Sequence, residues 1–205
     1  MRINKLQITA LALGVLGGAS AVCAATTAAT LEYGKFPLSF EPNVGQVNAG
    51  VLYVARGSGY SLGLSADRVA IVTRADSRGR ATTVNMRFVG ATPRLKHEPA
   101  EPLAGKVNYL VGNSSRWHTD IPTFRRVHYR NIYEGIDLAF YGALGRLEYD
   151  FVIAPGADPR RIRLQFDGVP RLALSEEGDL LLGDRLRQHK PYAYQVAPDG
   201  SKTKV

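Results

Sequence analysis

Apolar and polar residues alternate over short stretches along most of the chain, and this is the pattern of half-buried β-strands. In residues 60–64 tyrosine and leucine alternate with serine and glycine, and in residues 82–89 the apolar positions are Val84, Met86 and Phe88. No long window after residue 24 shows the 3.6-residue period of an amphipathic helix. The pattern therefore predicts a chain of short strands and turns.

The other predicted strands share β-branched or aromatic residues and are bounded by glycine, proline or asparagine. They span residues 51–55, 69–73, 106–113, 126–129, 136–141, 146–153, 162–166, 172–174, 180–182 and 191–196. Residues 92–103 contain three prolines and little periodicity, which predicts a long surface loop. Together these elements predict an all-β fold, a β-sandwich-like two-sheet domain of short antiparallel strands with little helix.

The N-terminal segment has the features of a secretory signal peptide, which we predict to span residues 1–24. Arg2 and Lys5 are basic, residues 6–18 are mostly apolar or small, and small residues continue to Ala24, where cleavage is expected. The apolar run is too short to cross a membrane. We therefore expect a secreted, extracellular or outer-envelope protein without a transmembrane segment in the mature chain.

Cys23 is the single cysteine, so disulfides are not expected in the mature chain. The alternative is a lipoprotein modified at Cys23, although Val22 before it fits that motif poorly. Residues 25–35 are rich in alanine and threonine and predict a flexible lead-in, followed by a single β-rich domain over residues 36–205. Because the chain ends where a hairpin has barely begun its second strand, we expect the domain to be truncated at its C-terminus.

Charge narrows the range of partners. The chain has 26 lysines and arginines against 18 acidic residues, for a net charge of +8, and the basic residues are spread out rather than run together. No stacking-aromatic motif accompanies the arginines, and export is at odds with binding nucleic acid. We expect a protein or a glycan at the cell surface as the partner, and no nucleic acid.

Five segments occur in an order that is specific to one family: residues 40–46, 55–60, 106–113, 133–142 and 147–159. Together they resemble the N-terminal domain of bacterial secreted proteins that carry SBBP β-propeller repeats. The resemblance implies an all-β domain at the envelope or outside the cell. It implies no established enzymatic role, so it supplies no catalytic residues.

Residues in these motifs suit turns and interior supports. In the first motif, Pro42 fixes φ, Asn43 and Gly45 tolerate positive φ, and Glu41 and Gln46 can pin the segment to the domain. We expect structural roles for these five residues and for further motif residues, namely Asn108, Tyr109, Gly135, Asp137, Pro155 and Gly156.

Glu148 and Asp150 lie two positions apart on a predicted strand and therefore share one face of it. Paired carboxylates can perform acid–base chemistry on a glycosidic bond, or bind calcium with help from Asp137 or Asp158. The favoured interpretation is structural: a solvent face, or ion pairs with Arg146, Arg161 or Arg163. We assign no catalytic residue, expect no cofactor, and keep calcium as an alternative. The four histidines lie far apart in the sequence and form no ligand-spaced pair.

Aromatic residues offer a second candidate site. Trp117, Tyr129, Tyr133 and Tyr141, together with Arg126, can line a sugar-binding surface because flat rings stack on the apolar faces of sugars. The alternative is that the rings belong to the core or to cross-strand pairs.

The sequence favours a non-enzymatic β-rich module for adhesion, assembly or protein interaction. One alternative is a glycan-binding module that uses the aromatic cluster. Another is a carbohydrate-active enzyme that uses Glu148 and Asp150. Residues 59–63 match the G-x-S-x-G motif of hydrolases, but Ser61 lies inside a strand pattern with no helix after it, so the motif does not favour a hydrolase.

Overall fold

A computed structural model describes residues 5–15, 38–75, 79–93, 95–143, 145–197, 199 and 201–205, and for residues 5–15 it describes the backbone alone. The predicted lipidation residue Cys23, the cleavage position after Ala24 and the lead-in at residues 25–35 lie outside the described residues.

Strands make up most of the described chain. They are β1 Lys5–Val15, β2 Phe40–Pro42, β3 Tyr53–Gly57, β4 Tyr60–Leu64, β5 Arg68–Thr73, β6 Thr83–Phe88, β7 Lys96–Tyr109, β8 His118–Tyr133, β9 Ile136–Ala143, β10 Arg146–Ile153, β11 Leu164–Asp167, β12 Leu172–Leu174, β13 Leu180–Leu182, β14 Leu186–Gln188, β15 Tyr192–Val196 and β16 Lys202–Lys204. Two short 3₁₀ helices accompany them, η2 Ser114–Arg116 and η3 Pro159–Arg161. The prediction of an all-β fold is confirmed.

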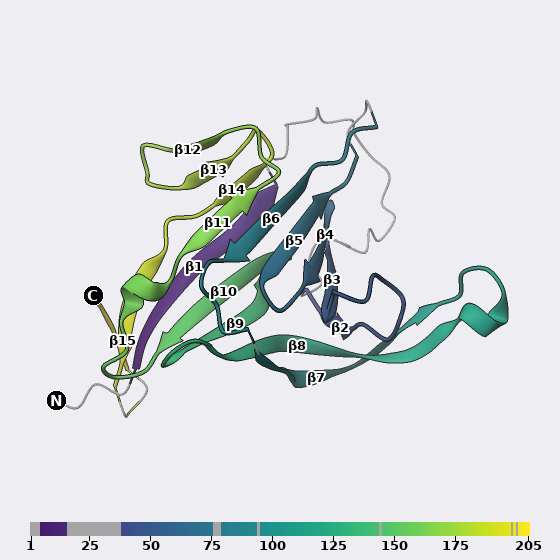
Figure 1. The fold of residues 1–205 in the computed structure, drawn as a ribbon, viewed down its shortest axis with the longest axis horizontal. Coiled ribbons are helices and arrows are strands. Elements are labelled where there is room, and N and C mark those ends of the chain that lie inside the picture. Colours follow the sequence, from purple (N-terminus) through teal and green to yellow (C-terminus); the bar gives the residue numbers. More distant parts are fainter. Residues whose placement is uncertain are drawn as a thin grey trace, which may run out of the picture.

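The strands form one continuous antiparallel sheet (Figure 1). Its order is β11-β6-β5-β4-β3-β2-β8-β9-β10-β1-β14-β13-β12, while β7 pairs with β8, β15 with β1, and β16 with β15. Neighbours in sequence are mostly neighbours in the sheet, since β3 to β6 and β7 to β10 are each joined as successive hairpins. This meander follows from the turn signals between short alternating stretches.

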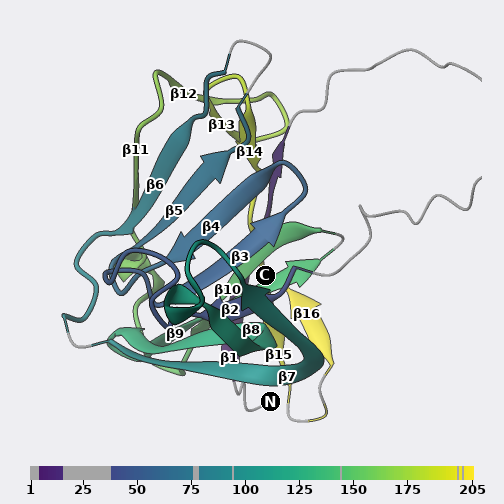
Figure 2. The same ribbon diagram turned by 90° about the vertical axis from the view of Figure 1, so that its right-hand side faces the viewer.

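The sheet curls, so strands β2–β6 and strands β8–β10 bury their inner faces against one another (Figure 2). The rings of Phe88 on β6 and Phe140 on β9 lie 6.3 Å apart across this core. The Tyr129 hydroxyl donates to the Ser65 carbonyl at 2.8 Å, and the Tyr60 hydroxyl donates to the Gly145 carbonyl at 2.9 Å. The two facing layers predicted for a sandwich are thus present as two parts of one sheet.

The loop predicted for residues 92–103 is wrong in its greater part, because β7 begins at Lys96. Pro99 and Pro102 lie in this strand opposite Val127 and Phe124 of β8. The ladder described for β7 is the one with β8, and proline is tolerated on such an edge strand because its missing N–H can face away from the ladder.

Backbone approach at Gly142 ties β9 to the start of the described domain. A Cβ atom at this position would lie 2.4 Å from the Cβ and 2.9 Å from the backbone nitrogen of Leu38. Leu38 itself is buried in the shared core. Only glycine therefore lets residue 38 pack against β9 without displacement.

We expect Gly142→Ala to lower the free energy of unfolding by about 1–3 kcal/mol, the usual cost of overpacking a well-packed site. Urea denaturation measures the change. Gly50→Ala is the matched control, because no atom lies within 4 Å of a Cβ placed there, and it should change stability by no more than about 0.5 kcal/mol. Equal effects of the two substitutions would contradict the packing argument.

Candidate functional site

Four of the residues predicted as site candidates come together on the outer face of β8, β9 and β10: Arg126, Tyr141, Glu148 and Asp150. We call them the tyrosine–carboxylate cluster. Strand register brings them together, because Arg126 of β8 pairs with Tyr141 of β9, which in turn pairs with Glu148 of β10. Alternation then turns Leu147, Tyr149 and Phe151 of β10 into the core, as the sequence predicted.

Tyr141 is the centre of the cluster. Its hydroxyl donates to Oδ1 of Asp150 at 3.0 Å, and the Arg126 guanidinium carbon lies 4.6 Å from the centroid of its ring. Arg126 is itself held by a 2.6 Å bond from its Nε to Oε1 of Glu101. A cation over the ring face is a favourable arrangement. Arg126 therefore helps to hold the Tyr141 ring in the orientation in which its hydroxyl bonds Asp150.

Burial sets the protonation behaviour of the cluster. Burial raises the pKa of Glu148 above its usual range; a hydrogen bond from Tyr141 opposes this, and the negative charge of Asp150 adds to it. Burial also raises the pKa of the Tyr141 phenol, and the charge of Asp150 adds to that rise. Tyr141 is therefore a neutral hydrogen-bond donor at physiological pH.

The two carboxyl groups differ in their surroundings. Asp150 is only 5% exposed, and Tyr141 occupies its Oδ1. A glycosidase needs both carboxyl groups directed at a bound sugar, with one on each side of the scissile bond. Among the arginines suggested as partners, Arg161 pairs with Glu134, at 2.8 Å.

The four aromatic candidates do not form one surface. Tyr129 and Tyr133 are buried in the core, and their hydroxyls donate to the carbonyls of Ser65 and Arg163. Trp117 follows η2, in the turn between β7 and β8, and is 45% exposed. Only Tyr141 shares the outer face with Arg126. Stacking on a sugar can thus use Trp117 or Tyr141 singly, but not as a common platform.

A second polar cluster joins three of the sequence motifs. Glu41 of β2 is buried. It accepts a 2.5 Å hydrogen bond from the Tyr109 hydroxyl and forms a 2.9 Å ion pair with Arg56. The Arg56 guanidinium carbon lies 5.0 Å from the centroid of the Tyr109 ring. Burial raises the pKa of Tyr109 to about 12, and the bond to Glu41 adds to the rise. This Glu41–Arg56–Tyr109 latch fixes β2 and β3 to the far part of β7.

Arg56 was not among the sequence candidates. The signal available was a charged residue directly after the apolar run 51–55 and inside one of the ordered motifs. The partners of Arg56 could not be predicted from the sequence. Glu41 lies 15 residues from Arg56 in the chain, and Tyr109 lies 68 residues from Glu41.

The first motif forms a turn around one asparagine side chain. Asn43 Nδ2 donates to the carbonyls of Asn48 and Val51 at 2.9 and 2.8 Å, while its Oδ1 accepts from the Gly45 backbone at 3.0 Å. Gln46 accepts from the Val44 backbone and donates to the carbonyl of Pro42. Gly45 has a φ of 113°, which only glycine adopts without strain.

The later motif residues also hold turns. Asn108 accepts from the Asp120 backbone at 2.7 Å, and Asp137 accepts from the Asn131 backbone at 2.7 Å and pairs with Arg130 at 3.0 Å. The Gly135 carbonyl accepts from the backbone of Ala154. Pro155 and Gly156 follow as a turn, with a φ of 85° at the glycine.

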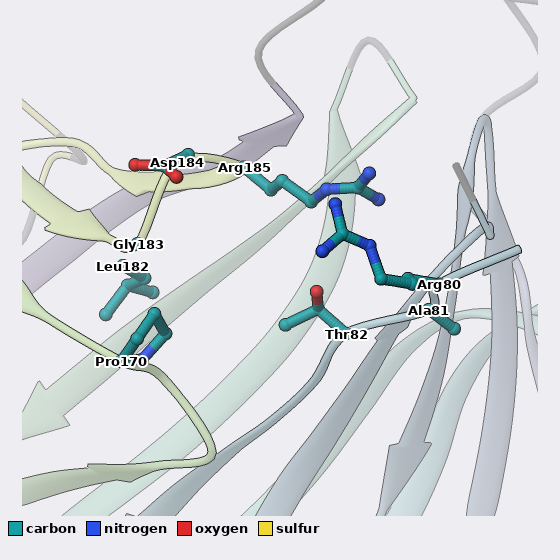
Figure 3. A pocket seen from close by; sticks show the side chains of 8 residues that line it. All are labelled: Arg80, Ala81, Thr82, Pro170, Leu182, Gly183, Asp184 and Arg185. Carbon is teal, nitrogen blue, oxygen red and sulfur yellow. The ribbon is translucent and has the colours of Figure 1, made fainter. Parts of the chain in front are cut away.

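A basic hollow of about 330 Å³ lies where the β5–β6 connection meets the β13–β14 turn (Figure 3). Arg80 and Arg185 extend toward one another above Thr82, and Asp184 points away from them. Arg185 is steadied by a 3.3 Å bond from Nη1 to the Arg74 carbonyl. Two guanidinium groups at one rim raise the local positive potential, which favours anions there. The sequence shows the basic residues only as spread out, and it does not single out this pair.

Within the described ranges, no three histidine, aspartate, glutamate or cysteine side chains lie where together they could hold a metal ion. Asp137 and Asp158, the suggested helpers for calcium, pair with Arg130 and Arg160. A membrane-spanning helix is likewise not found in the part of the chain that the structure describes.

The fold and its polar clusters define an all-β domain whose recurring motif residues are built into turns, a latch and strand-to-strand support. Residues 40–205 match the family model DUF7948, described as a domain of unknown function, and the chain belongs to this family. No curated protein and no solved structure matched the chain. The resemblance to the N-terminal domain of SBBP-repeat proteins stays a prediction.

The latch should contribute measurably to stability. We expect Tyr109→Phe to lower the free energy of unfolding by about 1.5–3 kcal/mol, because a buried carboxylate loses a charge-assisted hydrogen bond. Tyr192→Phe, on a ring that is 45% exposed, is the control and should stay within about 0.5 kcal/mol. If urea denaturation gave the same free energy of unfolding for both variants, the latch would not contribute this stability.

Glu148 should make stability depend on pH. Its pKa is higher in the folded than in the unfolded state, so the folded state holds the proton more tightly, and this contribution to stability is lost as the pH rises through the folded pKa. Glu148→Gln should therefore flatten the fall in stability above the ordinary glutamate pKa. Thermal unfolding across that range tests this, with Glu134→Gln, whose side chain is 81% exposed, as the control. An unchanged profile in Glu148→Gln would refute the argument.

Proposed function

We propose that this domain is a non-enzymatic interaction module of an exported bacterial protein, and that it binds a partner protein through the end of the β7–β8 arm. The observation that carries the proposal is the arm itself, a long two-stranded ribbon that runs beyond the rest of the sheet to η2 (Figure 1).

Apolar side chains gather at the end of this arm. Leu110 is 57% exposed, Val111 is 75% exposed and Trp117 is 45% exposed. We call residues 110–117 the arm tip. Scattered exposed apolar residues need no explanation, but a cluster at a projecting end is typical of an interaction site. Tryptophan is also enriched among the residues that dominate binding energy.

The arm tip is ordered by its own hydrogen bonds, which lowers the entropic cost of binding. Trp117 Nε1 donates to the Gly112 carbonyl at 3.3 Å, and Asn113 Oδ1 accepts from the Ser115 backbone at 3.3 Å as the cap of η2. Directly before the arm tip, the latch holds Tyr109 to Glu41. The apolar side chains are therefore presented on a braced support.

Export supports a cell-surface or extracellular partner, and it rests on the predicted signal peptide at residues 1–24. The resemblance to SBBP-repeat proteins favours the same setting. A non-enzymatic role is supported by the tyrosine–carboxylate cluster, in which the Tyr141 hydroxyl donates a hydrogen bond to the Asp150 carboxylate. Should Glu148→Gln combined with Asp150→Asn abolish a hydrolytic activity of the folded protein, the enzyme alternative would replace this proposal.

Glycan binding is the second candidate, and the exposed ring of Trp117 favours it. An array of surface glycans, probed with the full chain with and without calcium, separates the two candidates. Saturable binding to a defined sugar that is lost in Trp117→Ala would assign the arm tip to glycan recognition instead of protein recognition.

Substitutions at the arm tip should impair binding without unfolding the domain. We expect a photo-crosslinker at Val111 to give a saturable product with one envelope protein, and a crosslinker at Leu174, which is 74% exposed, to give none. Trp117→Ala should weaken that binding at least about tenfold, or 1.4 kcal/mol, and change stability by less than about 0.5 kcal/mol. Equal products from both crosslinker positions would contradict the proposal.

A further inference from the structure

The first strand occupies an interior place in the sheet. β1, Lys5–Val15, pairs with β10 on one side, from Leu6 opposite Ile153 to Leu13 opposite Leu147. On its other side it pairs with β15, from Lys5 opposite Val196 to Thr9 opposite Tyr192, and then with β14. Figure 1 shows it as the purple strand within the sheet, so its backbone is hydrogen-bonded along both edges.

The same segment is the apolar run of the predicted signal peptide. A segment that is removed after Ala24 cannot be a permanent strand of the mature domain. Its removal would leave the edge of β10 facing the edges of β14 and β15 across a gap about 9–10 Å wide, twice the spacing of neighbouring strands. Unpaired backbone N–H and C=O groups on both edges would then need new partners.

Removal would also uncover apolar surface. The β10 residues that face the core are Leu147, Tyr149, Phe151 and Ile153, each no more than 2% exposed with β1 in place. All four stand opposite β1 positions in the ladder, namely Leu147 to Leu13, Tyr149 to Ala10, Phe151 to Ile8 and Ile153 to Leu6. The vacated position would therefore offer two strand edges with unpaired backbone groups, and apolar side chains on the face toward the core.

We propose that the mature domain is a strand acceptor, in which the position of β1 is filled by an extended segment donated by a partner protein. The geometry defines that donor. It is a strand of about ten residues, antiparallel to β10, with apolar residues at alternate positions, as in other cases of strand addition.

The other positions of the donor face a mixed surface of a carboxylate, a valine and two tyrosines. Asp150 stands opposite Thr9 and Val152 opposite Gln7 in the ladder, and Tyr192 and Tyr194 flank them on β15. An opposite charge or a hydroxyl directly across from Asp150 is favourable, whereas a like charge is not. Small polar or basic residues at those positions therefore complete the donor.

The acceptor position differs from the ordinary edges of the sheet. β12 and β16 each pair on one side with β13 and β15, and a strand added there would gain a single ladder. A strand in the place of β1 gains two ladders and a share of the core. The inference does not depend on the arm tip, which lies between β7 and β8.

A peptide added in trans tests the proposal. The full chain is prepared with a site-specific protease sequence inserted after Ala24, cut, unfolded in urea and refolded with an excess of fluorescent peptide identical to residues 5–15. We expect the peptide to replace the cut segment and to co-elute with the domain. The amides of β10, β14 and β15 should then be protected from hydrogen exchange. The uncut chain, whose own β1 fills the position, should take up little peptide.

Two peptide variants make the test specific. Ile8→Pro combined with Ala10→Pro removes two N–H donors from the ladder and should weaken binding roughly 5- to 100-fold. Thr9→Asp places a like charge opposite Asp150 and should weaken binding about two- to fivefold, whereas Thr9→Lys should not.

The outcomes divide cleanly. A cut chain that refolds only when the peptide is present supports the proposal as strongly as peptide exchange does. A cut chain that refolds alone, protects β10 and β15 and takes up no peptide shows that these strands close on each other, and overturns the proposal. Protection confined to β12 or β16, or equal binding of the proline peptide, overturns it as well.

Discussion

The structure depends on one apolar core that both parts of a single curled sheet must share. Strands β2–β6 form one wall and strands β8–β10 the other, and Tyr129 stacks edge-on against Phe140 at 5.3 Å within it. Because the sequence has a single cysteine, at position 23, no disulfide within the domain can replace this burial. Each strand is therefore held mainly by its ladders and by its inward side chains.

This constraint explains why polar residues of the motifs have paired partners. Glu41 and Asp150 are buried and Asn43 is half-buried, and a buried carboxylate or amide without partners would be costly. Glu41 is paired with Arg56 and Tyr109 and Asp150 with Tyr141, all from other strands, while Asn43 bonds backbone carbonyls of its own turn.

Much of the fold could be predicted from local sequence, since alternation is a local property. Residues 60–64, 83–88 and 146–153 were recognised as strands because their inward positions are apolar and their outward ones are not. β7 was missed because its prolines read as a loop, and only the pairing with β8 shows that the strand lies where proline is tolerated. β1 was missed because its composition indicates a leader, and a leader and a buried strand share the same apolar character.

The candidate site shows the same division. That Glu148 and Asp150 share a face follows from their spacing, but that Tyr141 lies beside them depends on the register of β9 against β10. Likewise, Tyr129, Tyr133 and Tyr141 look alike in the sequence, and burial separates them. Long-range register is set by the turns and the whole core, so it cannot be read from any single stretch.

The edges of the sheet are protected in ways that its interior is not. β7 carries prolines, a φ of 58° at Glu101 and register irregularities between Leu103 and Tyr109, and β16 carries exposed lysines at positions 202 and 204. These are recognised means of preventing unwanted strand addition. β10, by contrast, alternates large buried residues and relies on ladder partners on both sides. The interior position beside β10 carries no proline or lysine of this kind, so it is the place in the sheet where an added strand would gain most.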